Sequence, residues 1–542
     1  MLIRLLTLSF LMLLTQTTWA QSINDEQLRS ELQQLTNAKL STNERVITGL
    51  SDQNHPRLEA IFSAYLNDNL YYVQSTKQLI ILTSNQSPYS ALDAYTADAL
   101  NPIDAALIKK VRSKNKIRQM LRAAISKLQL TDANPEKRLL AAQNIRSNAS
   151  ENERLLIENA LQSETNETIQ NILQETLLIL KVSDDKQSKE ERLSAITELS
   201  DALSNEAIQA LLPLRAKNSQ GEFTQDIELA NAADKAIKTI EFHRDLWSHV
   251  ETFFFGLSMG SVLLLVAIGL AITFGVMGVI NMAHGEMIMI GAYTAFVMQQ
   301  IMPGFIALSI WIAIPMAFLT AALVGILIER LVIRHLYGRP LETLLATFGI
   351  SLILQQLART IFSPLNKEVI TPEFLAGSLQ INDALSITYS RLYIVIFSVI
   401  IFLAVLYIMK YTSLGLQVRA VTQNRQMAKA MGINTDRIDM ITFGLGSGLA
   451  GIAGVALSQL TNVGPNLGQA YIIDSFMVVV FGGVGNLWGT FIAAFALGEL
   501  NKFIEPWQGA VLAKVIILVL IILFIQKKPR GLFPKKGRDA ED

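Results

Sequence analysis

Asn281, His284 and Glu286 lie within six residues of one another in a stretch that is otherwise apolar. The hydrocarbon core of a membrane offers no hydrogen-bond partner to polar groups. An ionisable side chain at the centre of a spanning helix costs about 2.5–3.5 kcal/mol on insertion scales. Such a group turns inward, so we expect these side chains to face the interior of a helical bundle and line a solute pathway. The alternative is a tight cytoplasmic turn between two spans, with Glu286 near the N-terminus of the second span, where the helix dipole favours an anion.

A second candidate for the pathway is the glycine-rich segment 481–489, FGGVGNLWG. Gly482, Gly483 and Asn486 make an uninterrupted span improbable, and a helix broken near the membrane exposes backbone groups that could bind a neutral polar solute. The alternative is a turn between two spans. The nearby glycines of segment 444–454 have the small-xxx-small spacing that is typical of close helix packing. Glu499 and Lys514 could form a structural ion pair.

The composition divides the chain into two unlike parts. The chain has 542 residues, of which 51% are hydrophobic, and it is polar and charged up to about His249 but a series of apolar runs from about Phe253 onward. Its formal net charge of zero averages two environments and is therefore uninformative. There is no cysteine, which excludes disulfides, cysteine-ligated metal and thiol catalysis.

The N-terminal part predicts an exported helical domain. Residues 1–20 have one early positive charge, a short apolar core and small residues before a cleavage point, which predicts a cleavable signal peptide rather than an uncleaved anchor. Residues 21–250 are expected to form a periplasmic helical domain. The segments 138–161 and 192–212 align, with Leu139, Ala141 and Ile145 opposite Leu193, Ala195 and Leu199, which favours a HEAT-like solenoid. Docking of a binding protein, contact with a partner permease and stability alone remain open as its role.

The part from residue 251 to residue 542 predicts a polytopic α-helical membrane domain, so the whole chain is expected to be all-α. We expect about nine spans, at residues 253–275, 287–302, 305–328, 341–362, 392–409, 440–460, 473–485, 488–503 and 510–525. Lysine and arginine concentrate in the loops after the third and fifth segments and in the C-terminal tail, which places these regions in the cytoplasm and the N-terminal domain in the periplasm.

The longest cytoplasmic loop covers residues 413–437. Its middle, Gln423 to Met431, predicts a short amphipathic helix with Met427, Ala428 and Met431 on one face, ended by Gly432. An energising subunit could grip such a helix. Anionic lipid headgroups could equally hold a basic loop of this kind.

The run TFGVMGVINMAHGEMIMIGAYT resembles the signature of permease subunits of ABC importers of the branched-chain amino acid class, most closely their urea-transport members. The resemblance implies a second related permease, two ATP-binding subunits and a periplasmic solute-binding protein as partners. It also implies that the 413–437 loop holds the coupling helix that contacts the ATPase, through the similar residues Arg419, Asn424, Ala428, Gly432 and Ile433. The chain has no G-x-x-x-x-G-K-[ST] motif with which to supply the nucleotide site itself.

The sequence is therefore interpreted as an ATP-driven urea permease of the bacterial inner membrane. A branched-chain amino acid ABC permease is the first alternative, and a stand-alone channel or ion-coupled transporter that uses Glu286 or Glu499 is the second. We expect membrane lipid as a partner, but no catalytic residue, cofactor, metal or nucleic acid.

Overall fold

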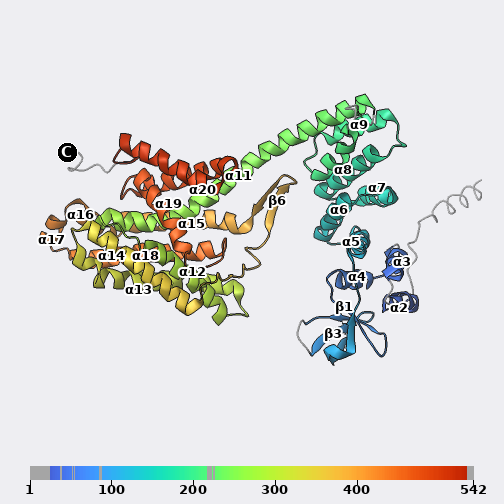
Figure 1. Cartoon of the computed structure of the whole chain (residues 1–542), viewed down its shortest axis with the longest axis horizontal. Coiled ribbons are helices and arrows are strands. Elements are labelled where there is room, and N and C mark those ends of the chain that lie inside the picture. Colours follow the sequence, from blue (N-terminus) through green and yellow to red (C-terminus); the bar gives the residue numbers. More distant parts are fainter. Residues whose placement is uncertain are drawn as a thin grey trace, which may run out of the picture. The chain divides into compact units, whose positions relative to one another are not determined.

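The computed structural model describes residues 25–533 apart from 37–39, 52, 54, 85–87, 217–222 and 224–225. The chain is mostly helical, as expected, and divides into two compact units, Met1–His243 and Arg244–Asp542 (Figure 1). The predicted signal peptide lies outside the described residues.

The N-terminal unit combines helices with one antiparallel sheet. Its α-helices are α2 (Asp25–Gln33), α3 (Leu40–Ser51), α4 (Leu58–Leu66), α5 (Asn115–Gln129), α6 (Pro135–Ser147), α7 (Arg154–Ser163), α8 (Glu167–Ser183), α9 (Lys189–Leu199), α10 (Asn205–Leu211) and the first part of α11 (Ile227–Met277). The sheet has the order β4-β3-β2-β1-β5, with β1 Leu70–Val73, β2 Leu79–Leu82, β3 Tyr89–Asp93, β4 Ala99–Ile103 and β5 Ile108–Lys110.

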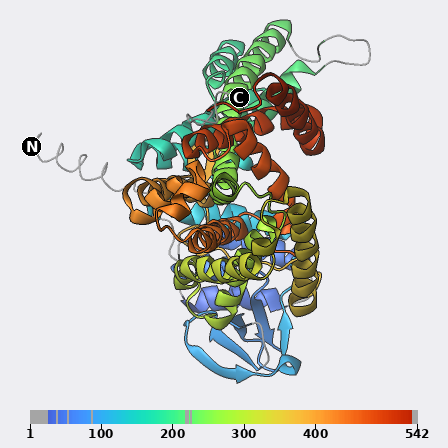
Figure 2. The same cartoon turned by 90° about the vertical axis from the view of Figure 1, so that its left-hand side faces the viewer.

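The sheet differs from the helical pattern expected across the N-terminal domain (Figures 1 and 2). Its strands have only three to five residues, and runs such as LIIL at Leu79–Leu82 do not reveal by periodicity whether they are strand or helix. β-Branched and aromatic residues decide in favour of strands. Leu70 pairs with Ile81, and one face of the sheet packs on α4 and α5 through Leu70, Leu79 and their neighbours.

The two aligned segments of the N-terminal domain have the same burial at the same positions. Ala141 on α6 and Ala195 on α9 are both fully buried, and so are Ile145 and Leu199. Each segment forms two successive helices, α6–α7 and α9–α10, and α8 packs against all four. This agreement supports a structural repeat, while the HEAT-like assignment stays a prediction.

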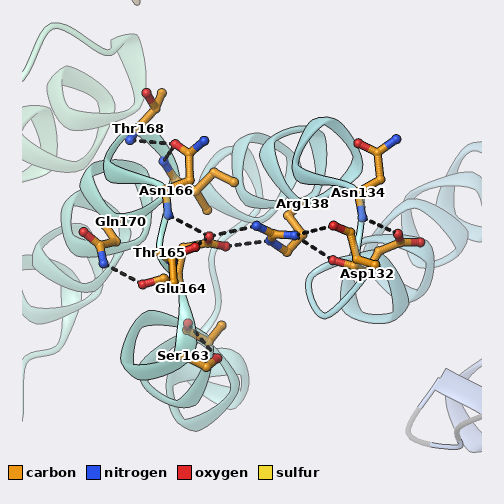
Figure 3. Close-up of polar contacts among 12 residues, drawn as sticks. Asp132, Asn134, Arg138, Ser163, Glu164, Thr165, Asn166, Thr168 and Gln170 are labelled. Carbon is orange, nitrogen blue, oxygen red and sulfur yellow. Dashed lines mark hydrogen bonds and ion pairs between the residues drawn. The ribbon is translucent and has the colours of Figure 1, made fainter.

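An arginine stands at the same place in both segments and binds the preceding loop. Arg138 forms a two-pronged ion pair with Glu164, at 2.8 and 3.0 Å, and donates to the Asp132 carbonyl at 2.8 Å (Figure 3). Arg192 donates to the Val182 carbonyl at 3.2 Å. Glu164 also accepts from the Thr165 and Asn166 amides and so ties α6 to the turn between α7 and α8.

The Glu164 ion pair predicts acid sensitivity of the N-terminal unit. The bond from Arg138, followed by two backbone amides, lowers the pKa of Glu164 to about 2. The stabilisation is present above the unfolded carboxyl's pKa and is lost as pH falls toward about 2, because the unfolded state binds the proton first. We expect Glu164→Gln to reduce the local unfolding free energy of α6–α8 at pH 7 by on the order of 2–3 kcal/mol, measured by hydrogen exchange in the full-length protein.

The matched control for this prediction is Glu158→Gln, because the side chain of Glu158 is exposed and lies 3.9 Å from Arg154. Its effect should be below about 0.5 kcal/mol. In the wild type, protection of α6–α8 should fall between pH 5 and pH 2 by more than in Glu164→Gln. Equal acid sensitivity in the two proteins would remove Glu164 as its source.

The second unit is a bundle of long apolar helices (Figure 1). It contains the last part of α11, then α12 (His284–Ile301), α13 (Ile306–Leu331), α14 (Pro340–Phe362), the hairpin β6 (Ser378–Asn382) and β7 (Leu385–Thr388), α15 (Tyr389–Tyr411), α16 (Ser413–Gln423), α17 (Arg425–Ala430), α18 (Thr435–Ser458), α19 (Leu467–Gly482) and α20 (Leu487–Lys527). α20 bends at Gly509, where the backbone is not helical.

Six helices in the described part of the chain are long and apolar enough to cross a membrane, namely α11, α13, α14, α15, α18 and α20. Each of the nine predicted segments falls mainly on a helix. The last two lie in the two halves of α20, and two others lie on the shorter or less apolar helices α12 and α19. The multi-span helical domain is thereby confirmed, and the number of crossings stays a prediction.

α18 is the central helix of the bundle. Its glycines lie against three neighbours: Gly446 against Gly269 of α11, Gly454 against Ile288 of α12, and Gly451 against Ala317 of α13. Of the most apolar 18 residues of α18, 83% are buried. The packing role predicted for the glycines of 444–454 is therefore seen in the structure.

Candidate functional site

The chain between α11 and α12 turns back into the interior of the bundle. The break begins at the exposed Gly278, whose φ of +65° suits glycine, and the side chains of Val279 and Asn281 are buried. His284 Nε2 lies 3.2 Å from the Val266 carbonyl, eleven residues before the end of α11. At 1.5 Å per residue this is about 16 Å back along α11. The segment 278–283 is thus non-helical chain that runs back beside α11, with Val279, Asn281 and Ala283 buried, rather than only a surface turn.

Asn281 and His284 hold the start of α12 in place. Asn281 Oδ1 accepts a hydrogen bond from the Ala283 amide at 3.0 Å, and the Met282 amide donates to Thr347 Oγ1 at 3.2 Å. His284 is completely buried and lies beside Gly269, where an added Cβ would lie 3.0 Å from His284 Cε1. Non-helical backbone at membrane depth is tolerated where it is buried in protein or lines a cavity, and these bonds satisfy it here.

Glu286 is the third residue of α12 and belongs to a buried polar network with α14. Its Oε1 accepts from Ser351 Oγ at 2.7 Å and from Gln355 Nε2 at 2.8 Å. Gln355 and Ser351 are also 3.3 Å apart. Ser351 is the middle residue of α14, about 16 Å from either end, so the network lies near the centre of a hydrocarbon layer about 30 Å thick.

The contribution of α14 to this site was not predicted. Thr343, Thr347, Ser351 and Gln355 are all buried, whereas the other side of α14 exposes Leu341, Leu345 and Ile353. The signal was present in the sequence, because polar residues recur every four positions from Thr343 to Arg359 and therefore share one helix face. We call Thr343, Thr347, Ser351 and Gln355 the α14 polar face.

The other predicted pathway residues form a separate group. Gly482 ends α19, Gly483 has a φ of +103°, and Asn486 caps α20 by accepting from the Gly489 amide at 3.2 Å. This turn is bonded to the C-terminal segment, because Asn486 Nδ2 donates to the Phe533 carbonyl at 3.2 Å and the Phe533 amide donates to Gly482.

The two groups lie at opposite ends of α19. Gly285, beside Glu286, packs on Gly468 at the start of α19, and Gly482 follows fourteen residues later, about 21 Å along the helix. The six predicted residues are therefore not brought together into one site.

The ion pair expected between Glu499 and Lys514 does not form. Lys514 pairs with Asp474 of α19 at 2.8 Å. The carboxylate of Glu499 is instead packed against Gly256 of α11, and neither of its oxygens has a hydrogen-bond partner among the described residues. The close approach of α11 and α20 at Gly256, Gly260 and Gly498 places it there.

The predicted coupling loop forms two short helices, α16 and α17, joined at Asn424. Asn424 ends α16 and caps α17 by accepting from the Met427 amide at 2.8 Å. Gly432, with a φ of +87°, ends the turn after α17, and the Ile433 amide donates to the Ala428 carbonyl. Arg419 on α16 is bonded to the Met409 carbonyl.

Ala428 does not share a face with Met427 and Met431, contrary to the prediction. Ala428 packs with Val418, Val421 and Ile438, whereas Met427 and Met431 are 60% and 77% exposed. Met427 and Met431 are four positions apart and lie on one side of the helix, whereas Ala428 is rotated by about 100° from Met427, toward Val418, Val421 and Ile438. The two methionines form an exposed apolar patch on α17 and the residue that follows it.

Arg425 joins α17 to α18 and to Tyr337, which lies in the connection between α13 and α14. Its guanidinium pairs with Asp439 of α18, donates to Tyr337 Oη at 3.0 Å and lies 4.2 Å from the centre of the Tyr337 ring. The side chain of Asp439 is 1% exposed. Burial raises the pKa of the Tyr337 hydroxyl, with the nearby Asp439 carboxylate as the next cause. Arg425 was not among the predicted coupling residues.

These features define a class of protein: an integral membrane protein with a broken helix and a polar network at mid-membrane depth, which is the arrangement of solute transporters. A family model described as branched-chain amino acid transport system / permease component matches residues 252–525. The chain belongs to this family.

Individual relatives agree with the family match. The chain is 29% identical over 294 residues to the high-affinity branched-chain amino acid transport system permease protein LivH of Salmonella typhimurium, covering 52% of this chain and 94% of LivH. It is 28% identical over 298 residues to BraD of Pseudomonas aeruginosa, covering 53% and 96%. A shorter match, 31% over 140 residues, links it to the ribose import permease protein RbsC of Escherichia coli, covering 24% and 44%. No solved structure matches significantly.

The comparisons confirm the resemblance to branched-chain amino acid permeases and do not support urea as the substrate. These relatives are named as transport permeases and not as enzymes, which agrees with the prediction that the chain itself is not an enzyme. The family match begins at residue 252, so the N-terminal unit lies outside it.

Proposed function

We propose that the chain is the permease subunit of an ATP-driven importer of branched-chain amino acids. The observation that carries this proposal is the family match over the membrane unit, together with LivH and BraD, both of which are named as branched-chain amino acid permeases. The relatives favour this solute over urea, which the signature motif had suggested. Urea remains the rival to be tested against it.

The buried network around Glu286 supports a pathway through the centre of the unit. Glu286, Asn281 and His284 lie where the helix is broken, and the α14 polar face adds four hydrogen-bonding side chains to the same region. Gly482, Gly483 and Asn486 contribute a rigid turn at the far end of α19, and we assign them a structural role in the proposed transporter.

The proposed partners are ATP-binding subunits, a solute-binding protein and a second permease subunit. Basic residues concentrate around α16, α17 and the C-terminal tail, which supports a cytoplasmic position for these regions and a periplasmic N-terminal unit. Met427 and Met431 would then face an ATPase, because exposed methionines suit an adaptable protein contact.

The test is ATP-dependent uptake of labelled leucine and labelled urea into proteoliposomes that hold the chain with its co-purified partners and binding protein. We expect leucine uptake that requires ATP and is not reduced by excess urea. Urea uptake that excess leucine does not inhibit would keep the family and change the solute. Flux of either solute without an ATPase would contradict the ATP-driven mechanism.

A further inference from the structure

Two buried polar atoms beside the helix break have no hydrogen-bond partner among the described residues. They are Glu286 Oε2 and His284 Nδ1, on side chains that are 1% and 0% exposed. An unsatisfied buried polar group costs about 1–3 kcal/mol, and more when it is charged. The other oxygen of this carboxylate, Glu286 Oε1, accepts from Ser351 and Gln355. The unpaired atoms therefore mark a place where a ligand would gain hydrogen bonds that the protein alone lacks.

The chemistry of the site selects a ligand that donates. With Glu286 ionised, as its place at the N-terminus of α12 favours, the carboxylate only accepts hydrogen bonds. A second carboxylate would be repelled there. We propose that Glu286 and the α14 polar face form a solute subsite that binds an N–H donor group. This inference rests on the proposed function and deepens it.

Two solutes carry this chemistry in different forms. The ammonium group of an amino acid brings a positive charge that compensates the carboxylate, whereas the amide groups of urea donate without a charge. The shared requirement is an N–H group within reach of Glu286 Oε2. The two forms respond differently to loss of the carboxylate charge, so the same variant distinguishes them.

α14 is the element that opens the subsite. Of the most apolar 18 residues of α14, 28% are buried, compared with 83% for α18. The Leu341 side chain of α14 is 82% exposed. Three hydrogen bonds join α14 to the region of the helix break: the Met282 amide donates to Thr347 Oγ1, and Ser351 and Gln355 donate to Glu286. α12 is instead fixed on α18 by backbone contacts at Gly291 and Gly454. Displacement of α14 therefore exposes Glu286 while α12 and α18 stay together.

The first experiment measures opening without depending on the solute. Because the chain contains no cysteine, Ser351→Cys introduces a single thiol. Its labelling by a small methanethiosulfonate reagent is followed in the full transporter complex, nucleotide-free and trapped with ATP and vanadate, with the labelled chain separated on a gel. A site that is open in about 0.1–10% of molecules in one state should react at least about tenfold faster when the open state is favoured.

The controls keep this result interpretable. Ser398 lies on α15, is also completely buried and donates to the Val395 carbonyl. The variant Ser398→Cys should therefore stay unreactive in both states. Thr347→Cys reports on the same α14 face should Ser351→Cys disturb the fold. Slow labelling of both Ser351→Cys and Thr347→Cys, at the same rate with and without nucleotide in a folded complex, would overturn the proposal.

The second experiment tests the donor group. Glu286→Gln should reduce leucine uptake about 10- to 100-fold, because a hydrogen bond to a charged group is worth about 1.5–3 kcal/mol. If the wild type carries urea instead, uptake of urea by the same variant should change less than about tenfold. Glu499 is a second carboxylate that has no hydrogen-bond partner among the described residues, so Glu499→Gln is the matched control and should transport normally.

The outcomes separate the two levels of inference. Normal uptake by Glu286→Gln contradicts the subsite and leaves the importer function intact. Absence of ATP-dependent uptake of leucine and urea by the wild type contradicts the proposed function, while thiol labelling still decides whether the subsite opens.

Discussion

Gly291→Ala is expected to destabilise the membrane unit by about 1–3 kcal/mol, near the upper end of that range. A Cβ at Gly291 would meet only backbone atoms of Gly451, with the Cα at 2.6 Å. Backbone cannot rotate away as a side chain can, so α12 and α18 must separate. The measurement is the thermal unfolding midpoint of the full-length protein in detergent, which should fall by several degrees.

The matched control is Gly349→Ala on α14. A Cβ at Gly349 would meet no atom of the described chain within 4 Å beyond its own helix backbone, and alanine has the better helix propensity by about 1 kcal/mol. This variant should be as stable as the wild type or more stable. If Gly291→Ala left the midpoint unchanged, the close contact of α12 with α18 would not be a determinant of stability.

Arg425→Met is expected to release α17 from α18. The variant leaves the carboxylate of Asp439 buried without a counter-charge, and breaking a buried pair in this way costs about 3–5 kcal/mol. We expect faster hydrogen exchange in α16 and α17. In the assembled transporter, we expect ATP hydrolysis to continue while leucine uptake per ATP falls.

The reverse change should be milder. In Asp439→Asn the cation that remains is already partly exposed and can extend toward water, so the loss should be smaller than in Arg425→Met. Arg425→Met combined with Asp439→Asn should recover part of the protection, because no charge is left buried. Equal exchange rates in the wild type and Arg425→Met would mean that the loop is held by its apolar contacts alone.

The helical membrane domain could be read from the sequence because hydropathy and length are local properties. The burial of Asn281, His284 and Glu286 was predictable for the same reason, since the cost of exposing polar groups to lipid forces them inward. The partners of Glu286 lie 65 and 69 residues away on α14. Only the four-residue spacing of the α14 polar face hinted at them.

Other features depend on tertiary contacts that no local pattern encodes. Lys514 was expected to pair with Glu499, and the packing of α19 on α20 pairs it with Asp474 instead. The short strands of the N-terminal sheet are stabilised by pairing with one another across the sequence. The glycines near residue 482 predicted a break correctly but did not indicate that the C-terminal segment packs on it.

The glycines of α18 have a mechanical consequence. Around most helices, long side chains form a compliant layer that can change rotamer and absorb a small displacement. At Gly446, Gly451 and Gly454 this layer is missing, and backbone meets backbone on α11, α12 and α13. We therefore expect a displacement of α18 to move α11, α12 and α13 with it, because little at these glycines can absorb the displacement.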